Sequence, residues 1–325
     1  MSTVTVVPES AIREIVTREN AYEAVKKAFE AIAEDRAEVF PVTFGTGLAP
    51  QDVFGVKAGA DSAGATVGLK IGSYWPDNGQ HDLPAHGSTI ILLDPDTGFP
   101  MAILGAAYLN GFRTAAANAI AVDYLARKDA SVLGVIGAGH QAEHEIRAVA
   151  AVRALSRIRI HTRSTGRAEW MARQLDDIDI PFEFTSAQQA VEGADIIATV
   201  TPSTQPIVRS EWVAAGAHVC AMGADSKGKQ ELDTDLVARA RWFADLPAQS
   251  VAIGEFQHAF AAGIIPSADT ICPLGRVTRQ PDLGRRDDEE ITVFDSSGIA
   301  IQDLSVARAM LELARERGLG STVEL

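Results

Sequence analysis

The sequence contains little cysteine and no long apolar run. Its two cysteines, Cys220 and Cys272, have neither C-x-x-C nor zinc-site spacing. We therefore expect reduced thiols, a cytoplasmic location and no metal centre. No apolar stretch reaches the ~18 residues of a membrane span. The first residues also lack the basic and apolar regions of a signal peptide, so no membrane association is expected.

Positive charge is scarce as well. Lys and Arg number 29 against 43 Asp and Glu, which gives a net charge of −14. Because nucleic acids and anionic membranes bind to basic surfaces, neither is expected as a partner. A small anionic substrate stays possible, since a few Lys and Arg decide the charge of a pocket. The 325 residues are enough for two domains.

The pattern of apolar residues changes along the chain. Residues 40–105 contain short β-like runs separated by Gly and Pro, which is typical of a mixed sheet. From residue 131 on, short apolar runs alternate with helical stretches, which predicts α/β architecture with a doubly wound parallel sheet. Residues 108–126 and 299–317 read as long helices. The charged stretch 280–290 predicts a solvated loop.

A glycine motif lies at the first of these strand–helix junctions. The apolar run 132–136 is followed by a G-x-G-x-x-A turn and then by a helix, which is the context of a dinucleotide-binding fingerprint. An ordinary tight turn between strand and helix is the alternative. The cofactor-binding residues predicted from this motif are Gly137, Ala138, Gly139, His140, Gln141 and Ala142.

The residues after the next strand bear on the choice of coenzyme. An acid at this place normally binds the ribose 2′-OH of NAD. Here the strand is followed by Thr162, Arg163 and Ser164, which suit a 2′-phosphate by charge and hydrogen bonding. The sequence therefore predicts NAD(P)(H) as cofactor and favours NADP. A solvent-exposed or adenine-stacked Arg163 is the alternative.

Five segments together resemble the ornithine cyclodeaminase/mu-crystallin family. They are 68–70 with 75–76 downstream, 111–117, 137–142, 223–232 and 294–300. The resemblance implies a dinucleotide-binding Rossmann domain at 116–299. It also implies a mixed α+β dimerisation and substrate domain built from both chain ends, 1–115 and 300–325. A homodimer and chemistry at the α-carbon of an amino or imino acid are expected accordingly.

The same resemblance assigns roles to particular residues. Arg113 would bind the substrate carboxylate, Lys70 would contact the carboxylate and the reacting centre, and Asp225 would act as general acid/base. His86 would line the substrate pocket. Each of these side chains could instead have a purely structural role. Residues expected near the coenzyme are Thr201, Ser297 and Gly298.

Two departures from the family concern the substrate. Residues 40–45 contain no Arg or Lys, where many relatives carry a further carboxylate ligand. Lys57 stands where the ornithine-cyclising branch places an acid, and a cation there would repel a second ammonium and attract a second carboxylate. The sequence therefore favours an NAD(P)H-dependent reductase of iminosuccinate, giving L-aspartate. An ornithine-type cyclodeaminase and a non-catalytic, crystallin-like NADP-binding protein are the alternatives.

Overall fold

The computed structural model describes residues 3–325 and divides into two compact units. Unit 1 consists of Met1–Arg113 and Ile299–Leu325, and unit 2 consists of Thr114–Gly298. Unit 1 is therefore assembled from both ends of the chain. Within residues 3–325, no helix is both long enough and apolar enough to span a bilayer.

Unit 1 is built on one mixed sheet with the strand order β18-β1-β7-β6-β5-β4-β2, and β3 pairs with β4. Neighbouring strands run antiparallel except β1 and β7, which are parallel. The strands are β1 (Thr3–Val7), β2 (Ala37–Val39), β3 (Thr43–Thr46), β4 (Val53–Asp61), β5 (Thr66–Tyr74), β6 (His86–Leu93), β7 (Pro100–Gly105) and β18 (Ser321–Glu324).

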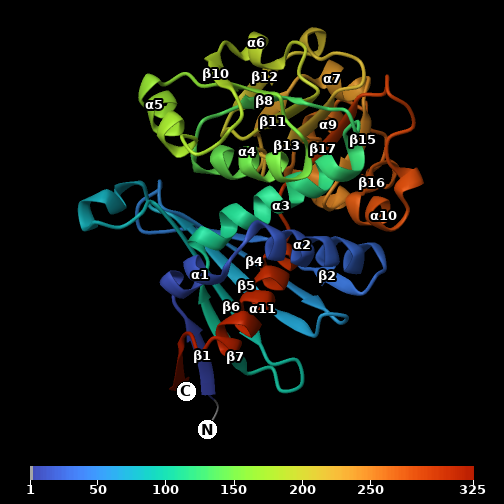
Figure 1. Cartoon of the computed structure of the whole chain (residues 1–325). Coiled ribbons are helices and arrows are strands. Elements are labelled where there is room, and N and C mark those ends of the chain that lie inside the picture. The colour runs from blue at the N-terminus through green and yellow to red at the C-terminus, as the bar shows by residue number, and fades with distance from the viewer. Residues whose placement is uncertain (1–2) are drawn as a thin grey trace. The chain divides into compact units, whose positions relative to one another are not determined.

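Helices α1 (Glu9–Ile15), α2 (Arg18–Ala33) and α11 (Ala300–Glu316) complete unit 1 (Figure 1). Thr17 and Asn20 form a reciprocal capping box at the start of α2, which satisfies two backbone donors there. Helix α11 packs on α2 and on strands β4 and β5. Its close approach depends on Gly59, where a Cβ would lie 2.7 Å from Ile301 Cδ1.

Helix α3 (Ala107–Leu125) begins in unit 1 and continues into unit 2. The carboxylate of Glu9 accepts hydrogen bonds from the backbone N–H groups of Ala107 and Tyr108, at 3.2 and 2.5 Å. It thereby caps the first turn of α3, where negative charge is favourable. The predicted helix over 108–126 is confirmed within one residue at each end.

Unit 2 contains an eight-stranded sheet with the order β10-β9-β8-β11-β13-β17-β15-β16. All its neighbouring pairs are parallel. The predicted α/β class with a doubly wound parallel sheet is confirmed. The strands are β8 (Val132–Ile136), β9 (Arg157–His161), β10 (Phe182–Thr185), β11 (Ile196–Thr199), β13 (His218–Ala221), β15 (Arg241–Ala244), β16 (Cys272–Pro273) and β17 (Thr292–Asp295).

Helices cover this sheet, and a separate parallel pair, β12 (Thr204–Val208) with β14 (Gln230–Leu232), lies beside it. Buried strands such as β11 and β13 carry apolar residues on both faces, as a sheet covered on both sides requires. The helices are α4 (His140–Val152), α5 (Thr165–Gln174), α6 (Ala187–Val191), α7 (Thr234–Ala238), α8 (Pro247–Ile253), α9 (Gln257–Ala261) and α10 (Leu274–Arg279).

The prediction of a solvated loop at 280–290 is wrong for Arg285. Its guanidinium donates to the backbone oxygens of Leu125 and Ala217 and to the hydroxyl of Thr292, at 2.7, 3.2 and 3.0 Å. These acceptors lie on three other segments of unit 2, so Arg285 anchors the stretch against the sheet. Burial is the main cause that lowers the pKa of Arg285.

Candidate active site

The loops predicted to bind the coenzyme share one edge of the unit 2 sheet. Because its strands are parallel, their carboxyl ends meet at the same edge, where ligands of open α/β sheets bind. Strand β8 leads there into Gly137, β9 into Thr162 and β11 into Thr201. Strands β13 and β17 lead into the segments that carry Asp225 and Ser297. The strand order reverses between β8 and β11, and ligands of open α/β sheets bind at such a switch point.

The fingerprint turn leaves its backbone open to a ligand. Gly137 has φ +120°, and a Cβ there would lie 2.8 Å from the Val200 oxygen, so only glycine fits. Gly139 is the N-cap residue of α4 and has nothing within 4 Å of a built Cβ. The buried Ala142 follows in the first turn of this helix. The free N–H groups of such a helix start suit a pyrophosphate, so the residues fit the predicted group.

The side chains of the fingerprint are held by the surrounding helices. The ring of His140 packs edge-on against Trp170 at 4.6 Å between centroids. Gln141 Nε2 donates to Glu145 Oε1 at 2.6 Å, and Asn118 Nδ2 donates to Glu145 Oε2 at 2.7 Å. Glu145 therefore fixes Gln141 at the start of α4.

The segment after β9 presents a cation and two hydroxyls. Arg163 is exposed, and Ser164 caps α5 by accepting from the Arg167 N–H at 3.3 Å. Thr162 Oγ1 accepts from the Ser164 N–H, also at 3.3 Å. No acid lies between β9 and α5. The arrangement is consistent with the predicted 2′-phosphate contacts.

The loops after β13 and β17 are held differently. Asp225 is exposed, and its carboxylate accepts from Lys229 Nζ at 2.5 Å. Ser297 and Gly298 are buried, and Gln249 Nε2 donates to Ser297 Oγ and to the Gly298 oxygen, at 2.8 and 3.0 Å. Asp225 is therefore reachable by solvent, whereas the Ser297–Gly298 backbone is tightly fixed.

The predicted substrate residues of unit 1 form a buried cluster around Asp303. Lys70 Nζ lies 2.7 Å from Asp303 Oδ2, and Arg113 Nε lies 3.0 Å from Asp303 Oδ1. The three residues are 7%, 8% and 1% exposed. Asn110 Oδ1 accepts from both cations, at 3.2 Å from Lys70 Nζ and 2.8 Å from Arg113 Nη2. Lys70 on β5 and Arg113 on α3 are thus brought together by a residue of α11.

The charges in this cluster perturb one another. Burial, with the nearby cations Arg113 and Lys57, lowers the pKa of Lys70 from 10.5 to about 7, although Asp303 opposes the change. Burial alone would raise the pKa of Asp303, but Arg113 and Lys70 hold it below its usual value. Asp303 is therefore ionised at neutral pH, while Lys70 is poised between charged and neutral forms.

Lys57 and His86 lie on the same sheet face as Lys70. Lys57 stands directly opposite Lys70 in the β4–β5 pair, and residues opposite each other share a face. His86 opposes Tyr74, four residues beyond Lys70, and their rings lie 4.6 Å apart. Lys57 is therefore part of the cationic cluster, whereas His86 lies farther along the face.

Three residues of this cluster were missed in the sequence, namely Asn110, Gln302 and Asp303. Arg113 Nη1 donates to Gln302 Oε1 at 3.5 Å. A signal existed for Asp303, because it lies within the apolar stripe of α11, next to the buried Leu304 and Ala307. An acid in the buried face of a helix requires a cationic partner.

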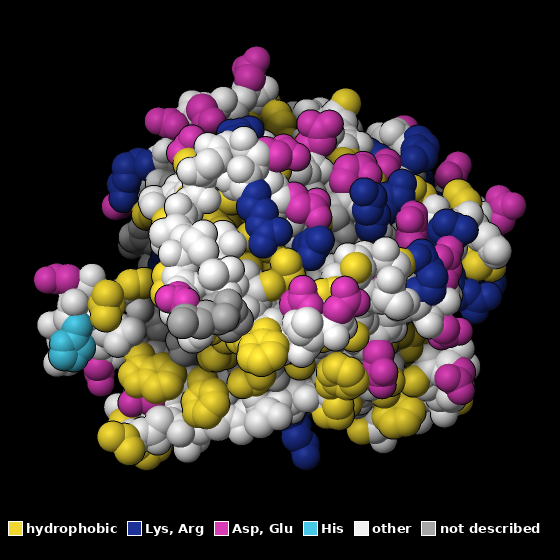
Figure 2. All heavy atoms as spheres, turned by 90° about the horizontal axis from the view of Figure 1, so that it is seen from below, with side chains coloured by type: hydrophobic (Ala, Val, Ile, Leu, Met, Phe, Trp, Pro, Cys, Tyr) yellow, Lys and Arg dark blue, Asp and Glu magenta, His cyan; other side chains and the backbone are white. Residues whose placement is uncertain are grey.

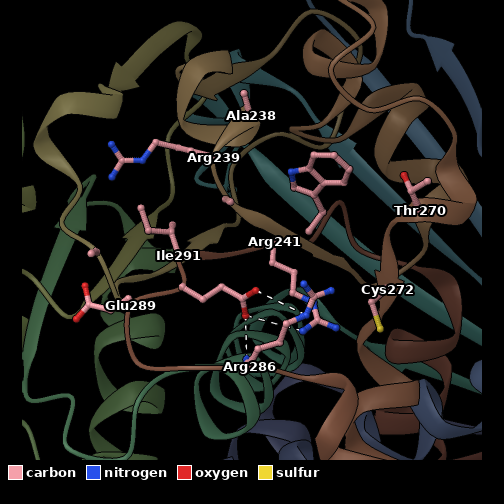
Figure 3. A pocket seen from close by; sticks show the side chains of 12 residues that line it. Ala238, Arg239, Arg241, Thr270, Cys272, Arg286, Glu289 and Ile291 are labelled. Atoms are coloured by element: carbon pink, nitrogen blue, oxygen red, sulfur yellow. Dashed lines mark hydrogen bonds and ion pairs between the residues drawn. The ribbon is translucent and has the colours of Figure 1, made fainter.

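A hollow of about 640 Å³ in unit 2 lies at the other edge of the sheet. Arg241 and Ile291, at the amino ends of β15 and β17, line it (Figure 3). Arg241 donates to the Gly284 and Leu283 oxygens at 2.5 and 2.7 Å, and it lies 3.8 Å from Glu290. The hollow is therefore remote from the fingerprint, and the charge of Arg241 is already compensated.

The parallel sheet, its glycine turn and the loops at its carboxyl edge define a dinucleotide-binding unit. In unit 1, two buried cations, Lys70 and Arg113, share the carboxylate of Asp303. The chain belongs to the ornithine cyclodeaminase/mu-crystallin family, whose model matches residues 4–318. The family resemblance seen in the sequence is thereby confirmed.

Relatives of known name match this chain over nearly its whole length. Iminosuccinate reductase of Paracoccus denitrificans is 42% identical over 320 residues, which cover 98% of this chain and 99% of that protein. Alanine dehydrogenase of Archaeoglobus fulgidus is 33% identical over 319 residues, covering 98% of each.

Solved structures agree with these matches. The P. denitrificans iminosuccinate reductase in complex with NAD+ superposes with a TM-score of 0.93 over 100% of both chains, at 42% identity. An archaeal alanine dehydrogenase dimer with bound NAD gives 0.92 over 100% of both chains, at 32% identity. Δ1-pyrroline-2-carboxylate reductase of Thermococcus litoralis with NADH and L-proline gives 0.92 over 98% of this chain and 100% of that chain, at 27% identity.

Proposed function

We propose that the protein is an NAD(P)H-dependent reductase that converts a small α-imino acid to an L-amino acid, with iminosuccinate and L-aspartate as the pair. The observation that carries the substrate class is the buried cluster of unit 1, in which Lys70 and Arg113 share the single carboxylate of Asp303. Two cations on one anion leave positive charge for a bound carboxylate. The relatives named iminosuccinate reductase and Δ1-pyrroline-2-carboxylate reductase support imine reduction.

Within this proposal each residue of the cluster has a distinct task. Arg113 offers a bidentate fork to the α-carboxylate of the substrate. Lys70 contributes a second donor to the carboxylate and to the reacting centre. Asp303 orients both cations, and Asn110 accepts from both, so neither cation has to reorganise when substrate binds.

Proton transfer is assigned to Asp225. Bound NAD(P)H supplies the hydride, which adds to the carbon of the C=N bond, and the nitrogen ends as an amine. A carboxylate favours the protonated, electrophilic iminium form of the substrate, and it can exchange a proton at that nitrogen. The exposure of Asp225 and its contact with Lys229 are consistent with this role.

The coenzyme is proposed to bind at the carboxyl edge of the unit 2 sheet. The fingerprint backbone at Gly137–Ala142, with Thr201, Ser297 and Gly298, would hold it. The cation and hydroxyls at residues 162–164 favour NADP as the preferred form. Since the relatives above hold NAD+, NAD or NADH, both coenzymes belong in the assay.

Lys57 sets iminosuccinate apart from other imino acids. It lies opposite Lys70, and its charge acts on both Lys70 and Asp303. A cation at this position favours a second carboxylate and disfavours the distal ammonium of ornithine. For that reason the reductase is preferred over an ornithine-type cyclodeaminase. A non-catalytic, crystallin-like role would not require Lys70, Arg113 and Asp303 to be brought together.

Homodimerisation and a cytoplasmic location belong to the same proposal. Hydrophobic side chains gather on the surface seen in Figure 2, and several strongly exposed ones belong to unit 1. In unit 1, Phe44 on β3 is 60% exposed and Ile71 on β5 is 37% exposed. Both cysteines are free thiols, as in a reducing compartment.

The test follows reduced coenzyme by its absorbance, with oxaloacetate or pyruvate and ammonia forming the imine in solution. We expect oxidation of the coenzyme only when keto acid and amine are both present, and faster with oxaloacetate. Ammonia release from ornithine without net coenzyme oxidation would instead identify a cyclodeaminase.

The substrate assignment is tested with Lys57→Glu. Reversing this charge should lower the ratio of kcat/KM for oxaloacetate to kcat/KM for pyruvate by about tenfold to hundredfold, which corresponds to ~1–3 kcal/mol. Lys57→Met, which removes the charge without reversing it, should give an intermediate ratio. An unchanged ratio in both variants would remove the reason for choosing a dicarboxylate.

A further inference from the structure

A buried acid connects two loops at the coenzyme edge of unit 2. Glu231, on β14, is fully buried. Its Oε1 accepts from the Thr201 N–H at 2.6 Å and from Thr201 Oγ1 at 2.7 Å. Its Oε2 accepts from Thr199 Oγ1 at 2.7 Å and from the Gly223 N–H at 2.9 Å. Four donors therefore converge on one side chain.

Three of the four donors come from the two loops that carry the proposed chemistry, and the fourth, Thr199, ends β11. Thr201 follows β11, and Gly223 follows β13, two residues before Asp225. The loops touch around the acid, because a Cβ at Gly223 would lie 2.3 Å from the Thr201 oxygen and 2.6 Å from Glu231 Oε2. Neither loop can shift at these points without breaking a hydrogen bond to Glu231.

Both oxygens of Glu231 must accept a hydrogen bond. Oε1 accepts from the Thr201 N–H and Oε2 accepts from the Gly223 N–H, and backbone N–H groups cannot reverse their role. Burial raises the pKa of Glu231, and the bonds from Thr199, Thr201 and Gly223 oppose that rise. The amide of Glu231→Gln has only one oxygen, so its NH₂ group would face the N–H of either Thr201 or Gly223.

A second buried acid, Glu255, lies behind the first and offers a matched comparison. It accepts from the backbone N–H groups of Glu231 and Leu232, at 3.0 and 2.6 Å. Burial and the neighbouring Glu231 raise the pKa of Glu255 well above its usual value. These bonds reach the backbone of β14 rather than the Thr201 loop or Gly223, so Glu255→Gln replaces a buried acid beside the same strand without touching either loop.

We infer that Glu231 is a positioning residue for the imine reduction, because it fixes the Thr201 loop against the backbone segment that presents Asp225. The inference rests on the proposed function for the role of Asp225. Glu231 lies out of contact with solvent and acts through the loops, whose geometry it determines by four hydrogen bonds.

The test compares Glu231→Gln with Glu255→Gln in the full chain. Hydrogen–deuterium exchange of peptides covering 199–204 and 221–228 should accelerate about tenfold to hundredfold in Glu231→Gln, the range for leaving a buried N–H donor unsatisfied. In Glu255→Gln the same peptides should change less than about twofold. Circular dichroism and the melting temperature establish that each variant is folded.

Steady-state kinetics distinguish a positioning role from a general loss of stability. In Glu231→Gln, kcat should fall about tenfold or more, while the KM for substrate and the Kd for coenzyme change less than about threefold. The primary isotope effect with deuterated coenzyme should rise, because a misplaced Asp225 slows the chemical step. Unchanged exchange together with unchanged kcat would overturn the inference.

A second variant and a second readout cover two possible failures, a variant that does not fold and a chain that reduces no imine. If Glu231→Gln does not fold, Thr201→Val removes one of the four donors and should show the same changes at smaller size. If the wild-type chain reduces no imine, the proposed function fails, but the exchange comparison still tests the positioning by Glu231. Equal exchange in the Gln variants of Glu231 and Glu255 would then refute it.

Discussion

A single buried carboxylate inside unit 1 is shared by two cations. Asp303 is 1% exposed and contacts both Lys70 and Arg113. Burying a charge is costly unless the charge is paired and hydrogen-bonded. Here two cations share one carboxylate, so one negative charge is missing. The pKa of Lys70, lowered to about 7 by burial and by Arg113, reflects that deficit. A bound carboxylate would supply the missing negative charge.

A consequence is that ligand binding takes up a proton. At pH 8 the free Lys70 amine is mostly neutral, because its pKa of about 7 lies below the pH. An anionic ligand favours the charged amine, raises its pKa and draws a proton from the buffer. Titration calorimetry of L-aspartate or succinate in buffers of different ionisation enthalpy should therefore show uptake that approaches one proton at pH 8 and shrinks toward pH 6.

Lys70→Arg is the control for this prediction. Arginine keeps its charge throughout this pH range, so its variant should bind the ligand without proton uptake. Equal uptake by the wild type and by Lys70→Arg would show that another group titrates.

At the scale of elements, the cluster depends on how closely α11 approaches the sheet. Gly59 on β4 and Gly68 on β5 face this helix, and Cβ atoms there would lie 2.7 Å from Ile301 Cδ1 and 3.2 Å from Leu304 Cδ2. Two missing side chains thus let the first turns of α11 lie directly on the strands. Asp303 lies between these two contacts in sequence.

We predict that Gly59→Ala destabilises the protein and weakens substrate binding together. The added methyl would also lie 2.7 Å from the Glu38 backbone oxygen, and Ile301 is fully buried. Relief therefore requires β2 to move or Ile301 to repack and push α11 outward, at a cost of about 1–3 kcal/mol. Displacing α11 moves Asp303 away from Lys70 and Arg113, which raises KM. Denaturant unfolding and steady-state kinetics measure the two effects.

Gly72→Ala, on β5, is the matched stability control. Nothing lies within 4 Å of a Cβ built at Gly72, so the same substitution should leave the free energy of unfolding nearly unchanged. If Gly59→Ala is equally harmless, close packing of α11 does not position Asp303.

Local patterns explain which elements could be predicted. The strand, turn and helix around Gly137 are adjacent in sequence, so the motif carries its own context. The Asp303 contacts join segments more than 180 residues apart, and the sequence offers only an acid in an apolar stripe as a signal. Arg285 shows the same limit, because its acceptors at Leu125 and Ala217 are remote in sequence.

At the scale of the whole molecule, the chain begins and ends in unit 1. The last strand, β18, pairs antiparallel with the first, β1, and α11 returns to the sheet after unit 2 is complete. Both chain ends are therefore required to build the substrate cluster. The family resemblance implied such an arrangement, whereas no local pattern predicted the strand over residues 321–324.

The sheet of unit 1 also bears on assembly. Side chains alternate between the two faces of a strand, so Lys70 and Ile71 point to opposite faces of β5. Lys70 contacts Asp303 of α11, and Ile71 therefore lies on the face turned away from this helix. An apolar face of this kind is suited to a second copy of the chain.

We predict a dimer of the 34.5 kDa chain that Ile71→Glu weakens. Buried carboxylates at a two-fold interface would face each other or apolar surface, and both are unfavourable. Sedimentation velocity at micromolar concentration should give a dimer for the wild type and a shift toward monomer for the variant. Phe184→Glu on β10 of unit 2 is the control, since Phe184 is also 37% exposed. A monomeric wild type, or dissociation of both variants alike, would contradict an interface on this sheet face.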